Sequence, residues 1–129
     1  MLKNGILNPH ILSLLARTRH TNALVIADRG FPFWTQIETV DISLVDDIPT
    51  VLQVFQAIRP EFKMGQVYMA EEFKQHNTQA VQQQFSAALQ GIPVAFEPHL
   101  DFKARVPQAV GLIRTADTLQ YANLILISA

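Results

Sequence analysis

Polar residues with acid–base chemistry flank the apolar run Leu24–Ala27 in this 129-residue chain. His20 precedes the run, Asp28 follows it, and a second polar group, Tyr121 with Asn123, opens the last apolar run. An imidazole can give and take a proton near neutral pH because its ordinary pKa is about 6.5. In an open α/β sheet, ligands collect where loops leave the ends of strands. The pattern therefore predicts a site in which His20 exchanges protons and Asp28 fixes its tautomer or holds a hydroxyl.

Each of these residues also has an ordinary structural explanation. A histidine is favoured at the C-terminal end of a helix by the helix dipole, and polar residues commonly follow buried strands. Tyr121 is typical of a strand and Asn123 of a turn. His99, which follows Pro98, fits either a surface loop or a group that donates to a hydroxyl. From the residues alone, the structural explanation of His20 is the better one, and the alternatives for the others are balanced.

Motifs for metals and nucleotides are weak or missing. Glu72 and His76 have helical i, i+4 spacing, but there is no HExxH motif and no cysteine, so a charged solvent face is the better interpretation. There is also no GxGxxG and no GxxxxGK[ST] sequence. We therefore expect neither a metal nor a cofactor.

Composition sets outer bounds on the fold and on the partners. A length of 129 residues with 49% hydrophobic content suits one domain, residues 1–129, with a sizeable core. The net charge of -1 gives no electrostatic reason to expect nucleic acid or an acidic membrane surface as partner. No apolar run approaches the roughly 20 residues of a membrane span, and there is no signal-peptide core or cysteine. We expect a cytoplasmic protein.

Hydrophobic periodicity alternates between helix and strand along the chain. Helices are expected from Asn8-Pro9 to about Arg19, from Pro49, after an N-cap at Asn77 with Gly91 at the far end, and over 99–106. Strands are expected at 24–27, 37–42, 66–70, 92–96, 109–114 and 122–128. This order predicts a three-layer α/β/α, Rossmann-like sandwich with a mostly parallel sheet.

The last two strands need a separate argument. The connection 115–120 is too short for a helical crossover, so these strands should be antiparallel neighbours or not adjacent. The strand 122–128 is free to lie at the edge of the sheet.

An ordered set of short motifs runs along nearly the whole chain. Its members are Lys3-Asn4-Gly5-Ile6-Leu7-Asn8, His20-Thr21, Asp28-Arg29-Gly30-Phe31-Pro32, Ala70-Glu71-Glu72-Phe73-Lys74-Gln75-His76-Asn77, His99-Leu100-Asp101-Phe102-Lys103, Ile113-Arg114-Thr115 and Tyr121-Ala122-Asn123. Each motif alone is weak, but their order is specific. With this set the chain resembles the RbsD/FucU sugar mutarotases, most closely the D-ribose pyranase branch.

The resemblance implies an RbsD-like fold and a cofactor-independent isomerase that interconverts the β-pyranose and β-furanose forms of ribose. It implies His20 as the proton donor and a substrate-binding set comprising Asp28, His99, Tyr121, Ala122 and Asn123. It also implies a homo-oligomeric ring, a pentamer or a decamer of stacked pentamers, in which the Tyr-Ala-Asn segment of one subunit reaches the His/Asp site of its neighbour.

Two alternatives stay open beside the ribose pyranase. One is a mutarotase with L-fucose-type specificity, although His99 favours ribose, and the other is a non-catalytic sugar-binding protein linked to ribose uptake. The chain departs from the ribose branch at Arg19, where that branch usually has Gly, at Arg29, and at Ala116-Asp117 in place of Gly-Glu. These departures leave the identity of the sugar open.

Overall fold

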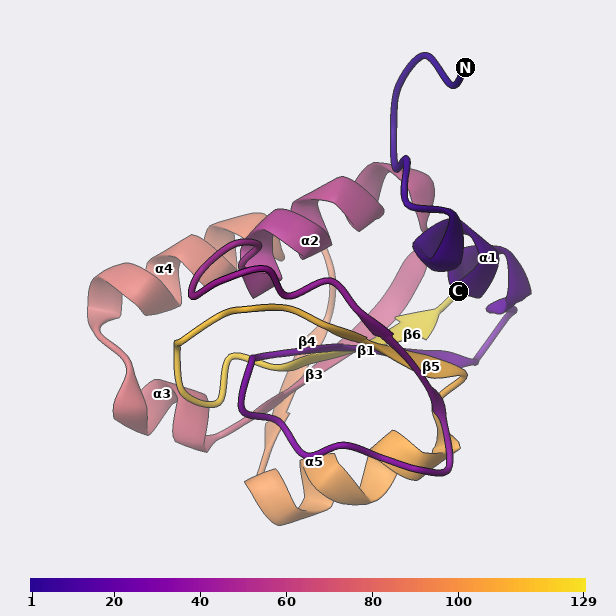
Figure 1. Ribbon diagram of the computed structural model, residues 1–129. Coiled ribbons are helices and arrows are strands. Elements are labelled where there is room, and N and C mark those ends of the chain that lie inside the picture. The colour runs from indigo at the N-terminus through magenta and orange to yellow at the C-terminus, as the bar shows by residue number, and fades with distance from the viewer.

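A six-stranded sheet with helices on both faces forms the body of the molecule (Figure 1). The structure, a computed structural model, describes all residues 1–129. The helices are α1 (Pro9–Arg17), α2 (Val51–Ile58), α3 (Glu72–His76), α4 (Gln79–Ala88) and α5 (His99–Arg105), with 3-10 turns at Arg59–Glu61 and Val106–Gln108. The strands are β1 (Ala23–Ala27), β2 (Glu38–Asp41), β3 (Met64–Ala70), β4 (Val94–Glu97), β5 (Gly111–Arg114) and β6 (Leu124–Ser128). None of the helices is long and apolar enough to cross a membrane.

The sheet is mostly parallel, as predicted. Its strand order is β2-β5-β1-β6-β3-β4, and only β6 runs antiparallel to its neighbours, β1 and β3. The last two strands are not adjacent, because β1 lies between β5 and β6. The expectation that the last strand lies at the edge is wrong: β6 occupies the middle of the sheet, where its uninterrupted apolar residues are buried on both faces.

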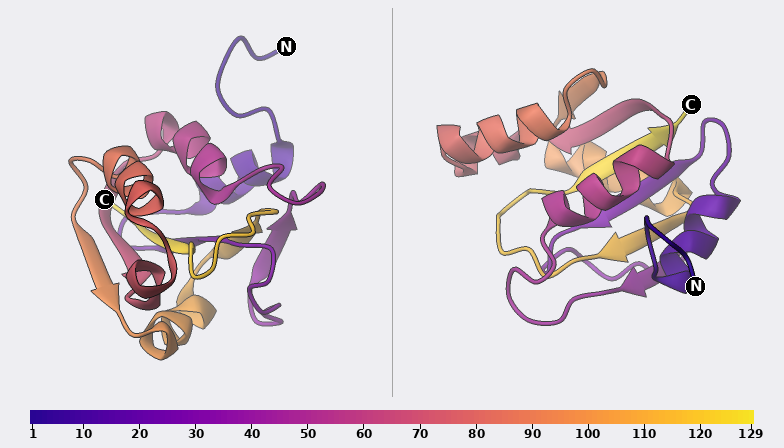
Figure 2. Two further views of the ribbon diagram at one scale, coloured as in Figure 1. Left: turned by 90° about the vertical axis from the view of Figure 1, so that its left-hand side faces the viewer. Right: turned by 90° about the horizontal axis from the view of Figure 1, so that it is seen from above.

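Two hydrophobic cores, one on each face of the sheet, make the architecture three-layered. The alternating residues of β1 divide between them: Leu24 and Ile26 join the core under α1, α2 and α4, whereas Val25 and Ala27 join the core under α5. Figure 2 shows α2 and α4 on one side of the sheet and α5 on the other. The second core also takes in Phe31 from the loop after β1, so this loop completes the thinner layer.

Helix capping explains where the predicted helix boundaries were right or wrong. Asn8 caps α1 as expected, since its side chain accepts from the N–H groups of His10 and Ile11. Pro49 does not start α2; Thr50 caps that helix through a capping box with Gln53. Asn77 is likewise not an N-cap.

The predicted third helix corresponds to α4, and a short helix that was not predicted, α3, precedes it. Asn77 ends α3 with an extended backbone, and Thr78 caps α4. Gly91, beyond the end of α4, has the predicted left-handed backbone with φ 83°.

The connections that carry polar residues lie along one edge of the sheet, the edge formed by the carboxyl ends of the parallel strands and not by an outer strand. The parallel strands β1, β5 and β4 end there, and the antiparallel β6 begins there. Asp28, His99 and Asn123 consequently leave or enter strands at the same edge. Topology thus brings together residues that are far apart in the sequence.

Candidate functional site

A cavity of about 420 Å³ opens at this edge of the sheet and contains most of the predicted site residues. Its wall combines the loop after β1, the first residue of α5 and the connection from β5 to β6. The lining residues are Asp28, Arg29, Gly30, Phe31, Pro32, His99, Asp117, Thr118, Leu119, Gln120, Tyr121 and Asn123. This size is within the range of small-molecule sites, and most of the wall is polar.

Asp28 is the carboxylate of the cavity. Burial raises the pKa of Asp28 above that of an ordinary Asp, and the charge of Asp117 acts in the same direction. Hydrogen bonds partly oppose the effect: the Asn123 side chain and the backbone N–H of Gly30, which lies 2.9 Å from the carboxylate, favour the ionised form. A partly desolvated carboxylate of this kind can accept a hydroxyl proton.

His99 is held in an aromatic cage. Its ring stacks on Phe102 at 6.1 Å and meets the rings of Phe31 and Tyr121 edge to face at 6.1 and 5.0 Å. Nδ1 is buried without a hydrogen-bond partner, so a proton on this atom is unfavourable. Burial, with a smaller effect of Lys103, lowers the pKa of His99, whereas Glu72 and Asp28 act in the opposite direction. The residue is therefore suited to contact a hydroxyl as a neutral imidazole.

The Tyr-Ala-Asn segment contributes three different functions. Tyr121 has a left-handed backbone with φ 58°, an uncommon conformation for a non-glycine residue, which turns the chain into β6. Asn123 is buried, and its Oδ1 accepts the backbone N–H of Asp28 at 2.7 Å. Ala122 is buried in the core under α1, α2 and α4, so its side chain is not part of the cavity wall.

Two residues that the sequence argument left unassigned fix the loops of the cavity. Arg114 donates to the backbone carbonyls of Asp28, Arg29 and Pro32 at 3.2, 3.3 and 3.2 Å. Asp117 is buried, and its carboxylate accepts the N–H of Val51 at the start of α2 and that of Leu119 within the loop. Only their positions in the sequence pointed to them: Arg114 lies within the Ile-Arg-Thr motif, and Asp117 follows that motif by two residues.

His20 does not lie in this cavity. It is exposed in the turn before β1, whereas Asp28 follows the other end of the strand. Five residues of strand at about 3.3 Å each put roughly 16 Å between the two ends. The neighbouring Thr21 donates its N–H to Ser128 at the end of β6, far from Asn123 at its start. Within one chain, the expectation that Asp28 fixes the tautomer of His20 is therefore wrong, whereas its alternative role of holding a sugar hydroxyl stays a prediction.

The structure also changes the expectation of which subunit supplies Tyr121 and Asn123 to the site. Tyr121 and Asn123 were expected to reach the His/Asp site of a neighbouring subunit, yet they line the cavity of their own chain together with Asp28. Of the predicted site residues, His20 and the core residue Ala122 do not line this cavity.

The rim of the cavity carries an ion pair. Arg29, the cation that departs from the ribose branch, forms an exposed ion pair with Asp46 at 2.7 Å. Next to it, Asp47 accepts the N–H of Thr118 at 2.9 Å. The loop after β2 therefore closes one side of the cavity, and the charge of Arg29 is balanced locally.

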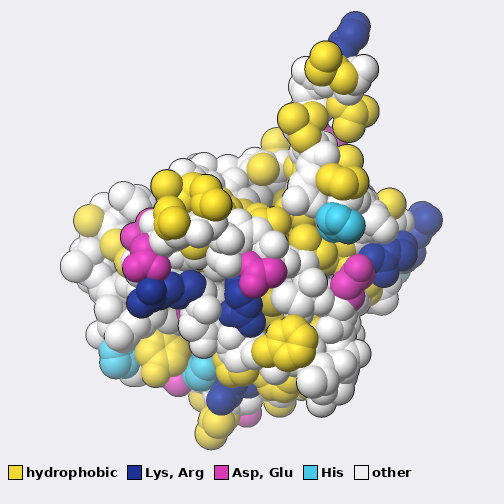
Figure 3. Space-filling view, in the orientation of Figure 1, with side chains coloured by type: hydrophobic (Ala, Val, Ile, Leu, Met, Phe, Trp, Pro, Cys, Tyr) yellow, Lys and Arg dark blue, Asp and Glu magenta, His cyan; other side chains and the backbone are white.

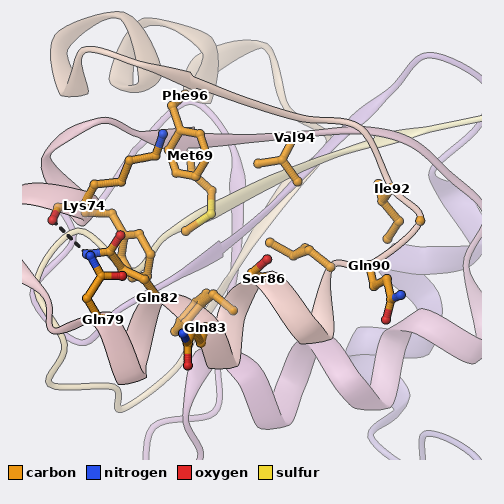
Figure 4. A pocket seen from close by; sticks show the side chains of 14 residues that line it. Met69, Lys74, Gln79, Gln82, Gln83, Ser86, Gln90, Ile92, Val94 and Phe96 are labelled. Atoms are coloured by element: carbon orange, nitrogen blue, oxygen red, sulfur yellow. Dashed lines mark hydrogen bonds between the residues drawn. The ribbon is translucent and has the colours of Figure 1, made fainter.

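A larger cavity of about 510 Å³ lies between α4 and the strands β3 and β4 (Figure 4). Its wall is formed by Met69, Val94, Phe96 and other apolar residues, with glutamines along its α4 side. Lys74 lies over the ring of Phe96, 3.7 Å from the centroid. It offers no pair of groups that could transfer protons, so the smaller cavity is the candidate site.

Comparison with known proteins gives a consistent result. A sequence model of the RbsD / FucU transport protein family matches residues 1–129. The chain is 41% identical over 128 residues to a D-ribose pyranase of Geobacillus kaustophilus (strain HTA426), which covers 99% of this chain and 93% of that protein.

Solved structures show the same fold. The structure of Bacillus subtilis RbsD complexed with D-ribose superposes with a TM-score of 0.93 at 31% identity, covering 100% of this chain and 98% of the other. A fucose mutarotase from Streptococcus pneumoniae in complex with L-fucose gives a TM-score of 0.84 at 17% identity, with 99% and 98% covered. The second likeness extends to the fold alone.

Proposed function

Because the chain belongs to the RbsD/FucU family, we propose that it is a D-ribose pyranase, an isomerase that interconverts the β-pyranose and β-furanose forms of ribose. The observation that carries this function is the convergence of Asp28, His99 and Tyr121 on one cavity of about 420 Å³. A carboxylate, an imidazole and a phenol offer both donors and acceptors to the hydroxyls of a pentose.

The chemistry needs one proton donor and one proton acceptor. Opening of the pyranose breaks the bond between C1 and the ring oxygen; that oxygen gains a proton while the anomeric hydroxyl loses one and becomes the aldehyde. The furanose forms when another hydroxyl adds to the aldehyde with the reverse proton transfers. Groups that titrate near the working pH are the best suited to both steps.

We assign the proton donor to His20 of a second copy of this chain. His20 is exposed and lies outside its own cavity, so it is available to a neighbour. Asp28 and His99 then position the sugar hydroxyls. A ring-shaped homo-oligomer, a pentamer or a decamer, would place each His20 at the next cavity in the same way around the ring.

The activity is tested by saturation-transfer NMR on ribose with the purified protein. We expect faster exchange between pyranose and furanose signals, unchanged by EDTA. His20→Ala should lower the exchange rate roughly 10²–10⁴-fold while weakening ribose binding much less. Binding without faster exchange of any aldose would favour the sugar-binding protein, and exchange of L-fucose in preference to ribose would favour the fucose-type mutarotase.

Sharing of the site is tested by mixing inactive subunits. His20→Ala and Asn123→Ala subunits, allowed to exchange, should regenerate activity in about a quarter of the sites of a randomly mixed ring. The matched control mixes Asp28→Asn with Asn123→Ala. Both residues belong to one cavity, so this mixture should stay inactive. An active monomer, or a first mixture that stays inactive after proven subunit exchange, would refute the assignment of His20 to a neighbour.

We place this activity in the cytoplasm as part of the same proposal. The absence of cysteine, and hence of disulfides, suits a reducing compartment. Cell fractionation followed by immunoblotting would check the location.

A further inference from the structure

We propose that α3 and the residue after it act as the positioning element of the sugar site, with Glu72 holding His99 and Asn77 holding the loop that carries Tyr121. The inference rests on the proposed function, because it assigns a task toward sugar binding to residues outside the cavity wall. Neither Glu72 nor Asn77 lines the cavity. Both act through residues that do.

Glu72 connects α3 to the first residue of α5. Both oxygens of its carboxylate accept the backbone N–H of His99, at 3.1 and 3.0 Å. A hydrogen bond to a charged acceptor is stronger than one between neutral groups. Glu72 thus fixes the backbone of the residue whose side chain faces the sugar.

His99 depends on this anchor more than most site residues do. Its Nδ1 has no hydrogen-bond partner, so no polar contact of the protein at that atom orients the ring. The orientation comes from aromatic packing and from the position of the backbone. A shift of the His99 backbone would therefore move the imidazole directly.

The far end of α3 contacts the other wall of the cavity. The Asn77 amide donates to the carbonyl of Phe73 in its own helix and to that of Gln120 in the loop, both at 2.9 Å. Beside it, the ring of His76 packs on the ring of Tyr121 at 5.0 Å. Histidine side chains lie at the lower left of Figure 3, where α3 and the start of α5 meet in Figure 1.

These contacts give the segment Glu72–Asn77 a common task. Glu72 and His76, which the sequence suggested as a charged solvent face, each contact a different wall of the cavity. The segment therefore sets the spacing between His99 and Tyr121, whose rings meet at 5.0 Å. That spacing sets the shape of the cavity wall that the two rings form together, and hence which arrangement of hydroxyls fits against it.

The test compares Glu72→Gln with Glu71→Gln, a matched change at the exposed neighbouring residue. We expect Glu72→Gln to weaken ribose binding roughly 3- to 10-fold, with the exchange rate at saturating ribose within about 2-fold of wild type. Glu71→Gln should leave both unchanged. By NMR, the pKa of the His99 imidazole should fall in Glu72→Gln, because Glu72 and Asp28 favour its protonated form against burial and Lys103.

A double-mutant cycle separates positioning from a general loss of stability. If Glu72 acts through His99, Glu72→Gln should weaken binding no further in a His99→Ala background. An equal weakening in both backgrounds, or normal binding by Glu72→Gln, would overturn the role of Glu72.

Asn77→Ala supplies the test at the other wall. We expect weaker ribose binding and shifted ring signals of Tyr121, with the pKa of the His99 imidazole unchanged because Glu72 is still in place. Unchanged Tyr121 signals and binding would overturn this half of the proposal. If the wild-type protein neither bound nor isomerised any sugar, the proposed function would fail, whereas the NMR shifts of His99 and Tyr121 would still report whether α3 positions them.

Discussion

Asp28 is a carboxylate that the fold keeps mostly out of water, at a cost to stability. Its raised pKa means that the folded state binds the proton more tightly than the unfolded chain does. Stability from this group is therefore present at low pH and is lost as the pH rises through the folded-state pKa. The charged form of Asp28 is therefore useful to the site but does not stabilise the fold.

Replacing Asp28 by Asn should consequently stabilise the protein while impairing the site. The amide can still accept from the N–H of Gly30 but carries no charge to desolvate. We expect the melting temperature at pH 7 to rise by roughly 1–4 °C, with a smaller difference at pH 4, and ribose binding to weaken. Thermal unfolding of both proteins at the two pH values is the measurement; a variant that melts lower at pH 7 would contradict the argument.

Burial shifts the pKa of His99 in the opposite direction to that of Asp28. Its lowered pKa keeps the imidazole neutral in the folded protein at pH values where the unfolded chain is already protonated. Ribose affinity should therefore hold as the pH falls past about 6.5, the ordinary histidine pKa, and decline only at lower pH. Calorimetric titrations from pH 5 to 8 would test this, with His99→Gln as the variant whose affinity lacks the decline due to imidazole protonation.

At the level of single residues, the sequence predicted that polar side chains at strand ends form a site, but it expected Tyr121 and Asn123 to come from a neighbouring subunit and Asp28 to lie beside His20. Asp28, His99, Tyr121 and Asn123 meet because strand ends share an edge of the sheet, which alternating helices and strands already imply. The contact between His20 and Asp28 failed because a strand of five residues separates its two ends. Proximity in sequence suggested a pair that the extended backbone keeps apart.

The connection from β5 to β6 is the element on which the cavity depends most. It contributes residues 117–121 to the wall and is tied at both ends, by Thr115 to the carbonyl of Ala27 at 2.8 Å and by Asn77 to Gln120. Asp117 adds a tie to the start of α2. The loop is therefore part of the rigid frame of the fold.

Removing the carboxylate of Asp117, which holds the middle of this connection, should destabilise the fold. Asp117→Ala leaves the N–H groups of Val51 and Leu119 without their buried acceptor, which should cost about 2–4 kcal/mol in the free energy of unfolding. Urea unfolding is the measurement, and Asp101→Ala at an exposed position of α5 is the control. A loss below about 0.5 kcal/mol would show that Asp117 does not fix the loop.

Elements were predictable where local chemistry decided them. The cap Asn8, a helix boundary at Asn77 and the left-handed Gly91 could be identified in the sequence, whereas the short helix α3 could not, because its five residues are too few to show a helical periodicity. The central position of β6 could have been inferred from the sequence. Four apolar residues in a row, Leu124–Ile127, indicate a strand buried on both faces.

For the whole molecule, exposed apolar side chains occur in segments that border the cavity. Phe33, Leu44 and Leu100 are 70%, 76% and 75% exposed, and each belongs to a loop or helix end next to the cavity. Apolar residues gathered in this way commonly mark a protein–protein contact. The proposed neighbour that brings His20 would cover them.

Disrupting this surface should dissociate the assembly and inactivate it together. We expect Phe33→Ser combined with Leu44→Ser to give a smaller species by sedimentation velocity and to lose ribose exchange, while the melting profile of the subunit remains cooperative. Phe33→Tyr combined with Leu44→Met keeps the apolar area and should preserve both properties. Full activity in a dissociated double Ser variant would contradict a shared site.

The central position of β6 has a consequence for synthesis on the ribosome. Apart from β6, no strand pairing joins β1, β5 and β2 to β3 and β4. Until residues 124–128 emerge, the nascent chain holds two half-sheets whose inner edges, β1 and β3, are unpaired and open to other chains. At about 5–20 residues per second, the nine residues between β5 and β6 take on the order of one second to synthesise, so the growing chain is exposed to misassembly during that interval. Chaperone dependence should therefore be greatest just before β6 is made.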